Sequence, residues 1–526
     1  MLYTTTALGG MFTAPHHLAT ETGLRVLRDG GNAVEAMVAA AATIAVVYPH
    51  MNAVGGDGFW LIAEPGQAPV GIDAAGWSAG MATPAFYADK GCDVIPARGP
   101  LAALNVAGTI SGWAKALDVG GGKMPLGRLL EDAAAHAANG VPVTQGQEDL
   151  TREKLDELKD VPGFAETYLV DGQPPACNDI LKFPALAATL RRLADVGLDD
   201  FYTGEIARSN AAYLESVGSP LRFDDFEAFS AKQVTPLEVT LSSGTVYNMP
   251  PPTQGVSSLM ILALFDRLGV TAGEGFDHIH GLVEATKQAF LLRNEHLTDL
   301  DFMKVDPNDW LESGFLDGLA GNIDPAKALE WPQIRKPGDT IWMGAIDGDG
   351  RAVSFIQSVY WEFGSGVTNP ETGVLFQNRG SGFTLDASHP NVLEPHKRPF
   401  HTLNPAMARL NDGRVLSYGN MGGEGQPQTQ AAVFSRYVMF GQPLQQAVTA
   451  PRWLLGRTWG EESTTLKLES RFDPALIEAL KAAGHVIDVV EPFTSTMGHA
   501  GAVCRHPNGL FEGAADPRSD GSAVGF

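Results

Sequence analysis

A hairpin signal two-thirds of the way along the chain constrains the fold most. Two β-type runs, at 340–346 and 352–359, flank a turn at 347–350 with the sequence Asp-Gly-Asp-Gly. Such a turn between two β-type runs is typical of a β-hairpin. Either plausible hairpin register sets Thr340 opposite Ser358 or its neighbour Gln357, so a second hydroxyl is a candidate partner for that of Thr340.

Thr340 is a candidate nucleophile because of where it stands. A surface loop at 335–338 precedes it, and the bond between Asp339 and Thr340 lies at the boundary between loop and strand. If this bond is cut, Thr340 gains a free α-amine beside its own hydroxyl, which gives base and nucleophile on one residue. Alone, an Asp-Thr pair is more often a turn that leads into a strand, so the neighbouring motifs decide.

Length and charge limit the function classes. The chain of 526 residues exceeds one ordinary core, so we expect two or more lobes or one large layered domain. The net charge of -24 argues against nucleic-acid binding, which depends on Lys and Arg neutralising phosphates. We expect a small-molecule substrate, and an anionic one stays open because a few arginines reverse the field inside one pocket.

The sequence gives no sign of export or of a membrane span. The three cysteines are far apart, and the first residues lack a basic and apolar leader. The most apolar segment, 36–48, is shorter than the roughly 20 residues that cross a bilayer. Asn32 and Glu35 before it resemble a capping box, which predicts a buried helix. We expect a cytoplasmic protein with no membrane contact.

Apolar spacing predicts a helix-rich region between residues 126 and 330. The expected helices are 126–138, 185–196, 256–268 and 279–297. Within this region His278, His280 and Glu284 are too loosely spaced to assign a metal, and we expect no cofactor. The glycine turn at 54–59 lacks the ending of a phosphate loop, so we interpret it as structural.

A second glycine turn follows a predicted strand at 414–417. Gly422 and Gly423 stand between this strand and an apolar run at 431–440. Paired glycines between strand and helix let backbone N–H groups face a ligand, which is the geometry of an oxyanion hole. A tight structural turn is the commoner reason for two glycines, so this pattern alone is weak.

Together these segments resemble the gamma-glutamyltranspeptidase family of N-terminal-nucleophile hydrolases. The motifs that carry the resemblance occur in the family's order: GGNAVEA (30–36), PPPTQG (250–255), DT (339–340), DGRAVS (349–354), FGSG (363–366), KRP (397–399), GG (422–423), APR (450–452) and ADPR (515–518). The resemblance implies an α+β fold, a four-layer αββα sandwich, made as a proenzyme. The proenzyme would cut itself between Asp339 and Thr340 into a large subunit, 1–339, and a small subunit, 340–526, which stay together.

The resemblance also implies catalytic roles. Thr340 would attack an amide carbonyl with its hydroxyl, and its amine would shuttle the proton. Ser358 matches the second hydroxyl that hydrogen-bonds the nucleophile, and the N–H groups of Gly422 and Gly423 would stabilise the oxyanion. The acyl group would then pass to water or to an amine.

The substrate-recognition residues depart from the family's pattern for γ-glutamyl donors. No arginine occurs in the segment 72–77, and the two serines expected after KRP are replaced around His401 and Thr402. Tyr360 stands where such members have an asparagine. Arg379 and Gly382 replace a glutamine and an acidic residue of such members. The binding site for the α-ammonium group of a γ-glutamyl donor is therefore altered as well.

Arg379 favours a substrate carboxylate close to the scissile carbonyl. We therefore expect a short anionic amide such as oxamate, bound by Asn378, Arg379, Tyr360, His401 and Thr402. A surface or structural salt bridge is the alternative role of Arg379. Three other functions stay open: a γ-glutamyl hydrolase or transferase such as glutathione hydrolase, a β-lactam side-chain acylase, and an unprocessed binding protein. A homo-oligomer of processed heterodimers and the position of a lid at 385–395 are also left open.

Overall fold

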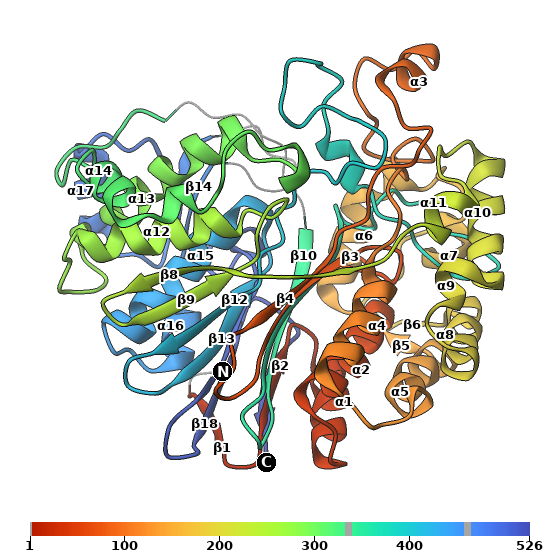
Figure 1. The fold of residues 1–526 in the computed structure, drawn as a ribbon, viewed down its shortest axis with the longest axis horizontal. Coiled ribbons are helices and arrows are strands. Elements are labelled where there is room, and N and C mark those ends of the chain that lie inside the picture. The colour runs from red at the N-terminus through yellow and green to blue at the C-terminus, as the bar shows by residue number, and fades with distance from the viewer. Residues whose placement is uncertain (1–2, 332–338, 457–463) are drawn as a thin grey trace.

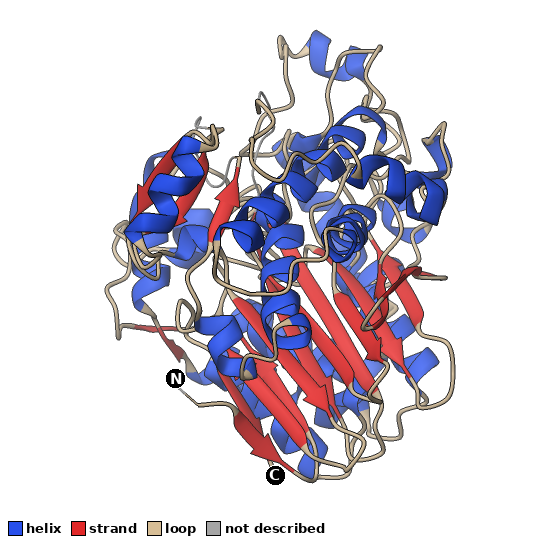
Figure 2. Ribbon diagram, turned by 90° about the vertical axis from the view of Figure 1, so that its left-hand side faces the viewer, coloured by secondary structure: helices blue, strands red, loops and turns tan. Residues whose placement is uncertain are grey.

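The computed structural model describes residues 3–331, 339–456 and 464–526. Two antiparallel sheets of seven strands each pack face to face, and helices cover the outer face of each sheet (Figure 1). This is the α+β fold expected from the sequence, a four-layer αββα sandwich. Figure 2 shows the strands lying side by side behind one of the helical layers.

Each sheet has a simple neighbour order. In the first sheet the order is β1 (Thr5–Ala7), β18 (Phe511–Ala515), β17 (Ala500–Arg505), β13 (Val415–Asn420), β12 (Ala406–Leu410), β9 (Gly244–Asn248) and β8 (Leu237–Leu241). In the second sheet it is β19 (Ser522–Gly525), β2 (Met11–Ala14), β10 (Asp339–Ile346), β11 (Ala352–Tyr360), β3 (Asp57–Ala63), β4 (Val70–Ala74) and β7 (Lys232–Val234). Two small sheets consist of β14 (Trp453–Leu455), β15 (Leu466–Glu469) and β16 (Ile487–Val490), and of β5 (Val141–Pro142) and β6 (Ile180–Leu181).

The helices divide between the two outer layers (Figure 1). Beside the second sheet lie α1 (His17–Arg28), α2 (Ala33–Val47), α4 (Thr109–Gly120), α5 (Leu126–Asn139), α6 (Gln145–Leu158), α7 (Phe164–Tyr168), α8 (Pro184–Val196), α9 (Asp200–Thr203), α10 (Glu205–Val217) and α11 (Phe223–Glu227). The short helix α3 (Pro84–Asp89) lies above them, at the top of Figure 1. Beside the first sheet lie α12 (Gly255–Arg267), α13 (Phe276–His296), α14 (Ser313–Ala320), α15 (Gln426–Phe434), α16 (Leu444–Thr449) and α17 (Pro474–Ala482). None of the helices in the described ranges is both long and apolar enough to cross a membrane.

Strands from both sides of Thr340 interleave in each sheet. The second sheet places β10 and β11 between β2 and β3, and the first sheet places β12 between β13 and β9. Ladder hydrogen bonds therefore join the part of the chain before Thr340 to the part after it. A cut before Thr340 would break one peptide bond and leave these ladders intact, because they consist of hydrogen bonds between strands.

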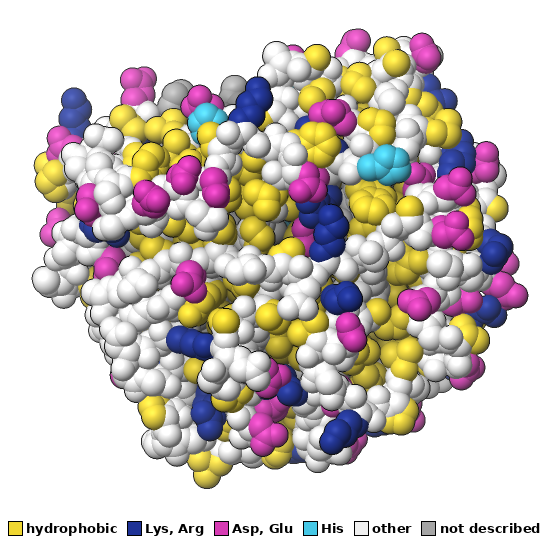
Figure 3. All heavy atoms as spheres, viewed as in Figure 1, with side chains coloured by type: hydrophobic (Ala, Val, Ile, Leu, Met, Phe, Trp, Pro, Cys, Tyr) yellow, Lys and Arg dark blue, Asp and Glu magenta, His cyan; other side chains and the backbone are white. Residues whose placement is uncertain are grey.

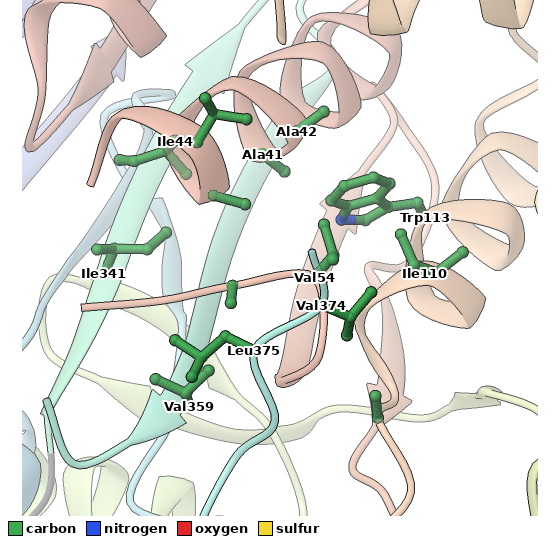
Figure 4. Close-up of a cluster of buried hydrophobic side chains, with 14 of the residues drawn as sticks. Ala41, Ala42, Ile44, Val54, Ile110, Trp113, Ile341, Val359, Val374 and Leu375 are labelled. Carbon is green, nitrogen blue, oxygen red and sulfur yellow. The ribbon is translucent and has the colours of Figure 1, made fainter. Parts of the chain in front are cut away.

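The helix α2 fixes the strand that carries Thr340. Its capping box is formed as predicted: the Asn32 side chain accepts from the N–H groups of Val34 and Glu35, each at 2.9 Å, and Glu35 accepts from the Asn32 N–H at 2.8 Å. Every residue of α2 is buried, which fits its apolar run. Its side chains pack with Ile341 of β10 and with other buried apolar residues (Figure 4). Each such buried Val or Ile stabilises the fold by roughly 1.5–3 kcal/mol, so the start of β10 is held firmly.

Candidate active site

Thr340 lies at the start of β10 with a fully buried side chain. The hairpin register pairs Ile341 with Gln357 and Asp339 with Tyr360. The register therefore shifts by one residue at Thr340, which is a β-bulge, a feature common beside active sites. The pairing that continues from Ile341 sets Thr340 opposite Ser358, one of the two expected registers.

Tyr360 ends β11 with a strained backbone. Its φ of 85° lies in the left-handed region, which bulky residues rarely adopt. The Ser358 hydroxyl accepts a hydrogen bond from the Tyr360 N–H at 2.8 Å and so helps to hold this conformation. Strain of this kind clusters at functional sites, and here it faces Asp339, the residue before the predicted cleavage point.

Arg379 is buried against Tyr360. Its guanidinium carbon lies 3.7 Å from the centre of the Tyr360 ring, and one of its nitrogens donates to the Thr402 hydroxyl at 3.3 Å. Only 1% of the residue is exposed, and burial lowers its pKa to about 10. The surface role left open by the sequence is therefore wrong. No ion pair of Arg379 occurs among the described residues, and its buried Nε has no acceptor there.

Asp57 supplies a carboxylate beside this arginine. It accepts hydrogen bonds from the Gly76 N–H at 2.8 Å, from Gln377 Nε2 at 2.8 Å and from His401 Nε2 at 3.1 Å. Burial raises the pKa of Asp57 to about 7, although these hydrogen bonds and the charge of Arg379 oppose the rise. Asp57 thus compensates the charge of Arg379 in part and leaves the Arg379 Nε without an acceptor among the described residues.

His401 is a neutral donor in this network. The Leu403 N–H donates to His401 Nδ1 at 3.4 Å, so the proton of the ring lies on Nε2, which faces Asp57. Complete burial and the nearby Arg379 hold the pKa of His401 well below its usual range. The predicted pair His401 and Thr402 therefore contacts the other candidate residues through Asp57 and Arg379.

Sequence reasoning missed Asp57. It belongs to the glycine turn at 54–59 that was interpreted as purely structural. A usable signal was present, because Asp57 is an ionisable residue that opens an otherwise apolar strand, and such a residue needs a partner. Its partners Gln377 and His401 lie more than 300 positions further along the chain, and only the fold brings them together.

Gly422 and Gly423 form the predicted turn between β13 and α15. Both have positive φ, 119° for Gly422 and 52° for Gly423. The angle at Gly422 is the one that a side chain would tolerate least, so the turn requires glycine there. No acceptor for their N–H groups is found among the described residues. Gln254, from the PPPTQG motif, donates to the carbonyls of Gly423 and Thr402, each at 2.8 Å, and so ties this turn to the Arg379 neighbourhood.

Asn378 has a different environment from the other predicted binding residues. Its side chain donates to the Ala97 carbonyl at 2.8 Å and accepts from the Trp361 N–H at 3.1 Å. Both ends of the amide therefore hold the loop that carries Arg379. Its contact with a substrate stays a prediction.

A pocket of about 560 Å³ opens beside these residues. Tyr360 lines it, together with Ser381, Phe400, Asn391 and Glu424, whereas Thr340 and Arg379 lie outside its lining. Two exposed carboxylates, of Asp93 and Asp386, also line the pocket. Tyr360 is thus the residue that both lines the pocket and contacts the buried arginine.

The predicted lid segment 385–395 is held in place along one wall of this pocket. Asn391 donates to the Gly382 carbonyl at 2.8 Å and accepts from the Phe400 N–H at 3.1 Å. Lys397 donates to the Pro390 carbonyl at 2.9 Å. The predicted lid segment therefore lies against the loop of Arg379, tied to its surroundings at Pro390 and Asn391.

Comparison with known proteins decides the family. A model described as Gamma-glutamyltranspeptidase matches residues 19–526. The chain belongs to the gamma-glutamyltranspeptidase family. A relative named oxamate amidohydrolase proenzyme, from Klebsiella pneumoniae subsp. pneumoniae, is 53% identical over 98% of each chain. A glutathione hydrolase-like YwrD proenzyme from Bacillus subtilis is 40% identical, also over 98% of each chain.

The fold of this gamma-glutamyltranspeptidase family member is shared with solved structures. The crystal structure of a cephalosporin acylase from Bacillus halodurans matches with a TM-score of 0.93 at 30% identity, covering 99% of this chain and 97% of that one. The family and its αββα fold, both expected from the sequence, are confirmed. The relatives are hydrolase proenzymes, so the chain is a member of a hydrolase family.

His280 and Glu284 of α13 meet His485, which follows α17, with ligand atoms within 4.8 Å of one another. Lys287 donates to Glu284 at 2.7 Å, and both side chains are buried. His280 accepts or donates to His485 at 2.9 Å, whereas His278 contacts Ser435 instead. The Lys287 ammonium already supplies the positive charge that Glu284 needs, so we assign no metal to this cluster.

Replacing Asp57 by asparagine is expected to change how the stability of this family member depends on pH. Because the folded pKa of Asp57 is raised to about 7, its contribution to stability is full below pH 4 and is lost as pH rises through 7. The asparagine variant lacks this contribution at every pH. As pH rises from 4 to 8, its free energy of unfolding should therefore increase relative to that of the wild type. Urea unfolding across this range measures the difference.

Asp195→Asn is the control for the loss of one carboxylate: Asp195 is exposed, so the stability of this variant should stay close to that of the wild type across the same range. A constant offset for Asp57→Asn would show that Asp57 does not titrate in this window.

Proposed function

We propose that the chain is a self-processing amidohydrolase that cleaves the C–N bond of a small anionic amide such as oxamate through a Thr340 acyl-enzyme. The observation that carries this proposal is Arg379: a buried guanidinium stacked on Tyr360, which in turn pairs with the residue before Thr340. Because a carboxylate matches the planar fork of a guanidinium, Arg379 would hold the acid end of the substrate.

Processing would precede activity. The Thr340 hydroxyl would attack the Asp339 carbonyl, and water would release the ester, leaving a large chain, 1–339, and a small chain, 340–526. The bulge at Thr340 and the strained backbone of Tyr360 support this step, since both distort the ladder at the bond to be cut. The interleaved sheets would then keep the two chains together.

Amide hydrolysis would use the same hydroxyl. Thr340 Oγ would attack the amide carbonyl, and the freed α-amine would take the hydroxyl proton and pass it to the leaving nitrogen, which departs as ammonia. An α-amine with a pKa of about 7.7–8.0 suits both transfers near neutral pH. Water would then attack the oxalyl ester, giving oxalate and the free enzyme.

Negative charge develops on the carbonyl oxygen during these steps, and hydrogen-bond donors must stabilise it. The N–H groups of Gly422 and Gly423 would stabilise the oxyanion, and their turn is tied by Gln254 to the segment of Thr402, which contacts Arg379. Removal of one such donor costs about 2.7–4 kcal/mol in other enzymes, so a fixed turn matters to the rate. Asp57 and His401 would position Arg379 rather than contact the reacting atoms.

The names of relatives agree with this substrate, since one that is 53% identical is called an oxamate amidohydrolase proenzyme. A second candidate is a γ-glutamyl hydrolase, as the name of another relative, glutathione hydrolase proenzyme of Escherichia coli at 30% identity, suggests. The exposed carboxylates of Asp93 and Asp386 along the pocket favour it, because they would suit an α-ammonium group, whereas Glu424 already pairs with Arg293 at 3.1 Å.

Two assays on the purified protein separate these candidates. We expect ammonia release from oxamate and at most slow cleavage of a γ-glutamyl anilide. Cleavage of the anilide alone would overturn the oxamate assignment and support the second candidate. Acetamide, which lacks the carboxylate, should be a far poorer substrate than oxamate if Arg379 grips the acid end.

A further inference from the structure

A second pocket lies at the end of the sandwich away from Thr340. It has a volume of about 350 Å³ and is bounded by the β3–β4 turn, the β12–β13 turn and Gly350 of the β10–β11 turn. Strand β10 runs from Thr340 to this end (Figure 1), and its six steps of about 3.4 Å separate the two sites by about 20 Å. The pocket is therefore distinct from the candidate active site.

Two arginines line this pocket from β12 and β17, the two strands of the first sheet that flank β13. The ladder pairs Arg409 with Val415, and Val415 in turn with Arg505. Directly opposed residues share one face of a sheet, and Val415 packs against the core between the two sheets. Both arginines therefore belong to the face that looks toward the second sheet, about 10 Å apart at two strand spacings.

These arginines have few partners. Arg409 donates to the backbone carbonyl of Glu64 at 2.9 Å. The backbone of Arg505 is paired in the β17 ladder, but its guanidinium makes no side-chain hydrogen bond or ion pair with any described residue, and its Nε is buried without an acceptor. Its guanidinium instead packs against the Gly350 backbone, where a methyl group would lie 3.3 Å away, and 6.0 Å from the Phe511 ring centre. A buried N–H without an acceptor in the protein can still donate a hydrogen bond to a bound ligand.

Two of the nearby carboxylates are already engaged. Glu64 pairs with Arg351, and Asp412 accepts from Arg414 at 2.7 Å. Arg409 and Arg505 thus keep two positive charges without carboxylate partners in a chain whose net charge is -24. On the face drawn in Figure 3, Lys and Arg side chains lie among Asp and Glu side chains in the lower part of the surface.

We propose that this pocket binds a small oxyanion with two or more negative charges, such as inorganic phosphate or a short dicarboxylate, between Arg409 and Arg505. Guanidinium groups bind such anions in a bidentate manner. The pocket combines the β3–β4 turn, before Thr340 in the chain, with Gly350 and both arginines, which follow it. A bound anion would link the two parts of the chain and raise the thermal stability without entering the active site.

Calorimetric titration with inorganic phosphate, and separately with oxalate, tests this site at constant ionic strength. We expect phosphate to bind the wild type and to raise its melting temperature. Arg505→Gln and Arg409→Gln should each weaken phosphate binding at least tenfold, and Arg505→Lys should weaken it less. Arg208→Gln, on α10, is the matched control and should bind as the wild type does.

Oxalate binding that is lost in Arg379→Gln belongs to the active site, and oxalate binding that is lost in Arg505→Gln belongs to this pocket. Unchanged oxamate turnover in Arg505→Gln would show that the variant is folded. Absence of phosphate binding to the wild type at millimolar concentration, or equal binding by the wild type and both glutamine variants, would overturn the proposal.

Discussion

Replacing Thr340 by alanine is expected to leave a single chain of 55.8 kDa and to abolish amide hydrolysis. The variant lacks the hydroxyl that would cut the chain, so the α-amine that serves as base is never released. With nucleophile and base both lost, we expect activity on oxamate to fall by at least about 1,000-fold. A denaturing gel and an ammonia assay measure the two effects.

The matched variant is Thr340→Ser, which keeps a hydroxyl at the same place. It should give two bands, more slowly than the wild type, and retain measurable activity. Two bands from the alanine variant would contradict the assignment of the nucleophile. A single band from the wild type would instead favour an unprocessed binding protein, the alternative that the sequence left open.

Replacing Arg379 by glutamine is expected to lower kcat/KM for oxamate by about 100-fold to 3,000-fold. This range corresponds to about 2.7–4.7 kcal/mol, which is typical for loss of one partner from a buried hydrogen-bonded charge pair. Arg379→Lys should recover part of the loss, since it restores the charge but not the planar fork. Steady-state kinetics with oxamate and with acetamide measure the change.

Acetamide is the internal control, because it has no carboxylate for Arg379 to hold and its slow hydrolysis should hardly change. The variant must first be shown to process, since Arg379 stacks on Tyr360 beside the cleavage point. Equal losses on oxamate and acetamide in a processed variant would mean that Arg379 supports the fold of the site and does not bind the substrate.

The parts of the fold that depend on local pattern could be predicted from the sequence. The capping box of Asn32 and Glu35 marks the helix at 33–47, and the turn at 347–350 marks the hairpin that carries Thr340. Both signals act over a few residues, so no knowledge of the tertiary structure is needed. The bulge at Thr340 was not predicted, because pairing patterns alone do not show where a ladder shifts.

The candidate site could be predicted only in part, for a physical reason. The motif residues Thr340 and Gly422 carry the family resemblance and Arg379 marks a departure from it, but burial and hydrogen bonding depend on distant segments. Asp57 shows this best: its carboxylate matters because Gln377 and His401 surround it, and neither is near it in the sequence. Likewise, only the structure separated a buried Arg379 from an exposed one.

The most direct test of the account is the intact mass of the small chain after a brief reaction with oxamate and an acid quench. The account predicts a chain that begins at Thr340 and a fraction of it heavier by one oxalyl group, with the added mass on the N-terminal residue. Hydroxylamine should remove the group if it is held as an ester. An oxamate-hydrolysing sample whose chain is uncut at Thr340, or whose added mass lies on another residue, would contradict the account.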